Sequence, residues 1–142
     1  MKLVVLAGVL FMLASSSSFA QHPATVGELI GKGGKKLAAE ELTKLISGTD
    51  ISGVSATNPA ATFEATYKRD GTFEGSIIAA RRIYVWGKWH VSEQGELCAD
   101  VQTQGSAAPN RVCTPYFELG GKYYQAKDAN NSQLVHHREI KR

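Results

Sequence analysis

The apolar residues of one early segment recur with the spacing of an α-helix. Residues 37–47 are rich in strong helix formers, and Leu42, Leu45 and Ile46 fall on one helical face. Gly48 follows directly, in the position where a glycine commonly ends a helix. We therefore predict one amphipathic helix over residues 37–47, with Leu42, Leu45 and Ile46 packed against a core.

From Thr62 onward, apolar and polar residues alternate, which is the period of a half-buried β-strand. About seven such segments follow one another at intervals of roughly 8–12 residues, joined by turn signals such as Asp70-Gly71. Short strands joined in sequence are typical of an antiparallel sheet that closes on itself. The expected fold class is mainly β: a small antiparallel β-barrel or barrel-like sandwich of about 7–8 strands with one N-terminal α-helix.

The alternation also assigns aromatic residues to the two faces of the sheet. In the strand expected over residues 83–91, Trp89 lies on one face, whereas Tyr84 and Trp86 lie on the other. We assign the face of Trp89 to the core, and exposed aromatic residues would then form a binding surface. The strand residues expected in the core are Phe63, Phe73 and Trp89. The candidate binding surface comprises Tyr84, Trp86, Tyr116 and Tyr124.

The first residues have the pattern of a secretory signal peptide. Lys2 supplies a positive charge, and an apolar run follows it to Ala14. Small residues then end in Ala20, which fits a cleavage site before Gln21. The apolar run is shorter than the ~20 residues that span a bilayer, and no second run follows it. We therefore expect an exported protein, periplasmic or secreted, with no membrane span.

The chain divides into three parts on this basis. Residues 1–20 form the signal peptide, and residues 21–36 form a flexible leader whose glycines and lysines break any periodicity. Residues 37–142 form a single β-barrel-like domain that begins with the predicted helix. This length is sufficient for one domain with a hydrophobic core.

Charge and motif content exclude several function classes. The 142 residues carry a formal net charge of only +3, so nucleic acid is not an expected partner. His90 and Asp100 could join a serine in a triad, but no nucleophile-elbow pattern occurs. His136 and His137 are adjacent and would point to opposite faces of a strand, which is unsuited to one metal ion. We therefore expect no catalytic residue, no metal and no cofactor, and a protein that is not an enzyme.

The chain has two cysteines, Cys98 and Cys113. In an oxidising compartment, a pair of this kind favours a disulfide, and two thiols without a nearby histidine make a poor zinc site. Successive hairpins would place the two strands that carry Cys98 and Cys113 side by side. We predict this disulfide, which closes a loop of about 16 residues.

Several short patterns together resemble a group of small exported bacterial proteins, the domain-of-unknown-function 995 family. The matching segments are the L-x-x-E-E-L helix of residues 37–48, Asp70-Gly71-Thr72, the G-x-W-x-V strand of residues 87–91, Leu97-Cys98 and Cys113. The resemblance implies the fold and the export, and it implies no activity. More distantly, the G-x-W strand is similar to that of lipocalins.

Three functions from different classes stay open. The first is an exported, non-enzymatic binding or interaction protein of the bacterial envelope, with another envelope protein as its partner. The second is a lipocalin-like carrier of a small apolar ligand, which requires a hollow barrel. The third is a small hydrolase, which requires a cleft with convergent polar residues.

Overall fold

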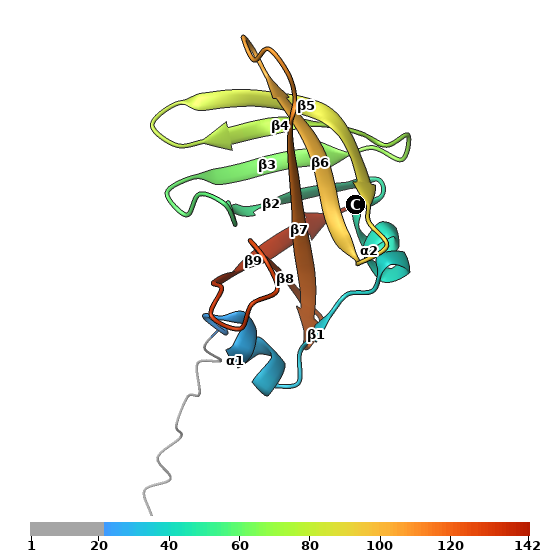
Figure 1. Cartoon of the computed structure of the whole chain (residues 1–142), viewed down its shortest axis with the longest axis vertical. Helices are drawn as coiled ribbons and strands as arrows, with labels where there is room; N and C mark the ends of the chain where they lie inside the picture. Colours follow the sequence, from blue (N-terminus) through green and yellow to red (C-terminus); the bar gives the residue numbers. More distant parts are fainter. Residues whose placement is uncertain (1–21) are drawn as a thin grey trace, which may run out of the picture.

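The computed structural model describes residues 22–142 and contains two helices and nine strands within them (Figure 1). The signal peptide expected over residues 1–20 lies outside the described residues. The helices are α1 (Val26–Gly31) and α2 (Ala39–Ile46). The strands are β1 (Lys35–Lys36), β2 (Thr49–Val54), β3 (Thr62–Tyr67), β4 (Thr72–Ile78), β5 (Arg82–Val91), β6 (Glu96–Thr103), β7 (Asn110–Leu119), β8 (Lys122–Ala126) and β9 (Val135–Lys141).

The strands form a closed antiparallel barrel. Each strand from β2 to β8 pairs with the next strand along the chain, and β9 pairs back with β2. Closure satisfies the backbone groups that an open sheet leaves exposed at its edges. The additional short strand β1 pairs with the end of β7. The mainly β barrel expected from the alternation of residues is therefore confirmed.

Helix α2 covers one end of the barrel (Figure 1). Its Leu42, Leu45 and Ile46 are buried in the main core, as predicted. The buried Thr49 hydroxyl donates to the carbonyl oxygen of Ile46 at 2.7 Å and so satisfies a helix-end acceptor. Gly48 joins the helix to β2 with a φ of +74°, a conformation that favours glycine. The remaining buried residues of this core are Leu37, Ile51, Ala65, Tyr67, Phe73, Val85, Trp89, Leu97 and Tyr116.

The expectation of a flexible leader over residues 21–36 is wrong for its described part. Helix α1 packs against the outer wall of the barrel and buries Val26 and Leu29 in a second core. Thr25 begins this helix, and its Oγ1 accepts a hydrogen bond from the Glu28 amide at 3.2 Å. The chain therefore has a second helix, which pattern reasoning missed because it is too short to show a period. The other residues of this core are Phe117, Tyr124, Ala126 and Val135, with Leu119 packed against them.

Candidate ligand cavity in the barrel

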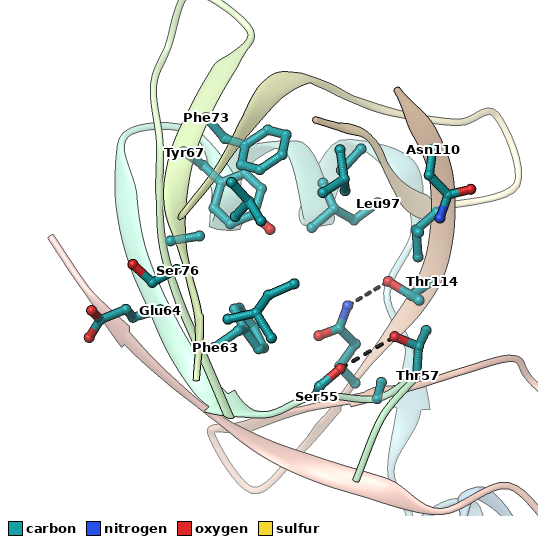
Figure 2. Close-up of a pocket in the computed structure, with 18 residues that line it drawn as sticks. Ser55, Thr57, Phe63, Glu64, Tyr67, Phe73, Ser76, Leu97, Asn110 and Thr114 are labelled. Atoms are coloured by element: carbon teal, nitrogen blue, oxygen red, sulfur yellow. Dashed lines mark hydrogen bonds between the residues drawn. The ribbon is translucent and has the colours of Figure 1, made fainter. Parts of the chain in front are cut away.

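The interior of the barrel is hollow. A cavity of about 240 Å³ extends along it, with Tyr67, Phe73 and Leu97 on its wall and Ser55 and Thr57 of the β2–β3 loop at its rim (Figure 2). Inward-facing residues of five strands, β3 to β7, form most of the lining, and these residues are largely apolar. They include Phe63, Ala65, Ile77, Val85, Ala99, Val101 and Val112.

The cavity exists because several inward positions carry small side chains. Ala65 and Ala99 point into the barrel from β3 and β6, where larger residues would fill the space. A barrel of this strand number has an interior just wide enough for side chains or for one small ligand. Small residues in the lining therefore favour the second outcome. A dry engineered cavity of ~150 Å³ binds benzene, so this one is large enough for a somewhat bigger molecule.

One part of the wall is polar and leads to a buried cation. Gln125 of β8 lines the cavity, and its Nε2 donates to the hydroxyl of Thr114. Its Oε1 accepts a hydrogen bond of 2.7 Å from Nε of Arg138. Arg138 is only 2% exposed, and its guanidinium carbon lies 4.9 Å from the centre of the Phe63 ring. Two residues of the lining, Gln125 and Phe63, thus contact the guanidinium directly.

The Arg138 guanidinium is incompletely satisfied. Its Nη1 donates to the carbonyl oxygen of His137 at 3.0 Å, whereas its Nη2 is buried and has no hydrogen-bond partner in residues 22–142. No carboxylate of the described residues forms an ion pair with it. The hydroxyl of Tyr116, which lies close to Arg138, is also buried without a hydrogen-bond partner in the described part of the chain. Buried polar groups are nearly always paired, so these two orphaned groups require an explanation.

Among residues 22–142, Arg138 is a buried cation without a counter-ion. Burial lowers the pKa of Arg138, and the neighbouring Tyr116 and Tyr67 raise it. Arginine nevertheless stays protonated in proteins. Burial raises the pKa of Tyr116 to about 12, and burial also raises the pKa of Tyr67. Both phenols are therefore neutral at neutral pH and supply no negative charge to balance the guanidinium.

Of the four aromatic residues predicted to form a binding surface, two are exposed and two are buried. Tyr84 and Trp86 are 67% and 42% exposed on the outer face of β5, as predicted. The assignment of Tyr116 and Tyr124 to the surface is wrong, because both are buried. Tyr116 points into the main core, and Tyr124 faces outward but is covered in the second core that contains α1.

The predicted core positions are occupied as expected, with one informative difference. Phe73 and Trp89 are buried in the main core. Phe63 packs against the same core but is only partly buried. Phe63 lines the cavity, which leaves part of its ring uncovered, and the Arg138 guanidinium lies over this ring.

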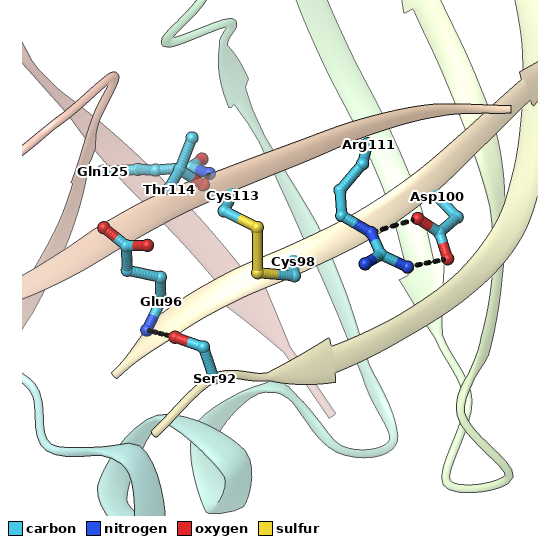
Figure 3. Close-up of a disulfide and its surroundings, with 8 residues drawn as sticks. All are labelled: Ser92, Glu96, Cys98, Asp100, Arg111, Cys113, Thr114 and Gln125. Atoms are coloured by element: carbon cyan, nitrogen blue, oxygen red, sulfur yellow. Dashed lines mark hydrogen bonds and ion pairs between the residues drawn. A yellow bond between two sulfur atoms is a disulfide. The ribbon is translucent and has the colours of Figure 1, made fainter. Parts of the chain in front are cut away.

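The predicted disulfide is confirmed and lies on the wall of the barrel (Figure 3). Cys98 of β6 and Cys113 of β7 are directly opposite in the register, with their Cα atoms 4.0 Å apart. Asp100 and Arg111 form the next outward pair along these strands. Nε and Nη2 of Arg111 donate to the two carboxylate oxygens of Asp100 at 2.7 and 2.9 Å. This hydrogen-bonded pairing lowers the pKa of Asp100. Asp100 therefore binds Arg111. A catalytic triad would instead require a hydrogen bond between Asp100 and His90, and these two residues form none.

Histidines of β9 do not gather into a metal site. His136 is partly buried and its neighbour His137 is exposed, in keeping with the alternation of a strand. Within residues 22–142, no three side chains of the kind that bind metals lie close together. His137 instead forms an edge contact with the Tyr124 ring.

The polar residues at the cavity wall and directly behind it were not identified from the sequence. Thr114, Gln125 and Arg138 come from three different strands and carry no motif. A signal for one of them was present, because Arg138 is two positions from Ile140 on the same face of β9. A charged residue in phase with a core position indicates a special role.

Fold and cavity together define the class of protein: a small up-and-down antiparallel barrel with a largely apolar interior space. The family described as "Protein of unknown function (DUF995)" matches residues 10–142. The chain therefore belongs to this family, as its motifs indicate. No curated protein and no solved structure matches the chain. Neither helix in the described part of the chain has the length and apolar character needed to cross a membrane.

Proposed function

We propose that this protein binds a small apolar ligand inside its barrel. This is the carrier function that stayed open in the sequence, and the hollow, largely apolar interior is the observation that supports it. By proportion to the ~150 Å³ site that holds benzene, the ligand has roughly ten non-hydrogen atoms. We do not propose a hydrolase, because Asp100 is engaged by Arg111.

The proposal includes export to the periplasm or beyond. The Cys98–Cys113 disulfide is consistent with an oxidising compartment. A binding protein in that compartment would carry or sequester its ligand and would not transform it. The test of location is the free-thiol content of protein taken from its host without reduction, which should be zero.

Binding itself is tested with a neutral apolar probe of the right size. Isothermal titration with 1-octanol should show saturable binding of one molecule per chain. Ala99→Leu places a larger side chain in the cavity and should weaken binding by about tenfold or more, because the probe loses its space. Ala129→Leu is the matched control, since Ala129 is exposed in the β8–β9 loop. Equal binding by parent and Ala99→Leu protein would contradict the proposal.

A second candidate is the interaction function expected from the sequence, with an envelope protein as the partner. Tyr84 and Trp86 are exposed beside a hollow on the outer wall of the barrel. Exposed tyrosine and tryptophan side chains are typical anchors of protein interfaces. Replacing both by serine should abolish crosslinking to the partner in the intact cell envelope. The same variant should bind 1-octanol like the parent, which separates the two functions.

A further inference from the structure

We propose that the ligand of the cavity is an amphipathic monocarboxylate, bound through its carboxylate by Arg138. This inference rests on the proposed binding function and adds the charge and orientation of the ligand. Its basis is the unpaired guanidinium behind the cavity wall, together with the apolar space in front of it.

A buried cation without a counter-ion is costly, and this protein retains one. Isolated charges in a protein interior lose their hydration, and a partner of opposite charge recovers that loss. Arg138 is partly stabilised by the Gln125 amide, the His137 carbonyl oxygen and the Phe63 ring, but none of these groups carries a negative charge. An anionic ligand in the adjoining cavity would complete the site.

Arg111 shows in the same molecule how such a guanidinium binds a carboxylate. Its Nε and Nη2 form one edge, and each donates to one oxygen of Asp100. Only half of the corresponding edge of Arg138 is engaged: Nε donates to the amide oxygen of Gln125, and Nη2 has no acceptor among residues 22–142. A carboxylate that displaced the single Gln125 oxygen would accept both hydrogen bonds.

Access to this edge runs through the cavity. Gln125 lines the cavity and covers the Nε side of Arg138, so rotation of its side chain brings the edge into contact with the cavity. The buried hydroxyl of Tyr116 lies close to Arg138 and is a further donor on this side of the core. The apolar chain of the ligand would then lie along Phe73 and Leu97 (Figure 2).

The test compares three probes of one length: octanoate, 1-octanol and octylammonium. Isothermal titration should show octanoate binding at least about tenfold more tightly than 1-octanol, as expected for charge-assisted hydrogen bonds. Octylammonium should bind more weakly than either, because its charge repels Arg138. Arg138→Met should reduce octanoate affinity to the level of 1-octanol, because the charge-assisted hydrogen bonds are lost.

A second variant keeps the guanidinium in place. Gln125→Glu supplies an internal carboxylate to the same edge of Arg138 and should weaken octanoate by about tenfold or more through competition. Arg81→Met is the matched control for charge removal, because Arg81 is exposed in the β4–β5 turn. Its octanoate affinity should equal that of the parent.

The outcomes separate the two proposals. If 1-octanol binds in the cavity as tightly as octanoate, the carboxylate inference is wrong and the apolar binding function stands. If both Arg138→Met and Gln125→Glu bind octanoate like the parent, the inference is also wrong. If neither octanoate nor 1-octanol binds, the binding function itself is wrong and the inference falls with it.

Discussion

The indole Nε1 of Trp89 donates a hydrogen bond of 2.9 Å to the backbone carbonyl oxygen of Lys68. Trp89 belongs to β5, whereas Lys68 directly follows β3, so the bond connects a strand to the turn between β3 and β4. The Trp89 amide also donates to the carbonyl oxygen of Gly71 at 2.8 Å in the same turn. Trp89 therefore holds together the end of the barrel that α2 covers.

Replacement of this indole should destabilise the barrel. Trp89→Phe removes the hydrogen bond and part of the buried surface, and we expect the free energy of unfolding to fall by about 1–3 kcal/mol. Trp86→Phe is the control, since Trp86 lies on the same strand but is 42% exposed, and its effect should stay within about 0.5 kcal/mol. Urea unfolding measures both. Equal effects would contradict the assignment of Trp89 to the core.

Helix α1 should contribute to stability although the sequence indicated a leader. Leu29 is fully buried against the outer wall of the barrel, so Leu29→Ala should lower the free energy of unfolding by about 2–5 kcal/mol. Its neighbour Ile30 is 45% exposed, and Ile30→Ala should change the free energy of unfolding by less than about 0.5 kcal/mol. Thermal and urea denaturation would compare the two. A Leu29→Ala protein as stable as the parent would mean that α1 is not docked.

Reduction of the disulfide should weaken the fold without abolishing it. Cys98 and Cys113 are 15 positions apart, and the chain-entropy model assigns a loop of this length about 3 kcal/mol of stabilisation. The parent protein should therefore unfold at lower urea concentration when a reductant is present. Double replacement of the cysteines by alanine should remove this response to reductant. A parent protein that is insensitive to reductant would show that the disulfide does not stabilise the barrel.

Stability should decrease as the solution becomes mildly acidic. Partial burial lowers the pKa of His136 and of the more exposed His137, with Arg138 contributing at His136 and His22 at His137. The unfolded chain binds these protons near the ordinary value of about 6.5, more readily than the folded chain does. The free energy of unfolding is therefore greatest above that pH and falls as the pH decreases through it. Urea unfolding at one pH above this value and one pH below it should show the loss of stability. Replacing both histidines by glutamine should make this loss smaller.

Part of the candidate site followed from the sequence, and part did not. The alternation in β5 correctly separated Trp89 from Tyr84 and Trp86, because the two faces of a strand are set by the period of the backbone itself. Tyr124 also faces outward from its strand, as the alternation indicates, but the expectation that it is exposed was wrong. Helix α1 covers Tyr124, and a helix of six residues is too short to be predicted from a local sequence pattern.

The sequence by itself determined helix α2, the strands β3 to β9 and the neighbours of these strands, but it did not reveal α1, β1 or β2. Alternating residues and short turns specify hairpins, and each hairpin pairs strands adjacent along the chain, which places Cys98 beside Cys113. Only the tertiary structure decided that β9 pairs with β2 and that the barrel stays hollow. Closure brings Arg138 of β9 beside Phe63 of β3, whereas the β8–β9 hairpin already places Arg138 beside Gln125. The cavity depends on the summed volumes of side chains from five strands, so no single segment encodes it.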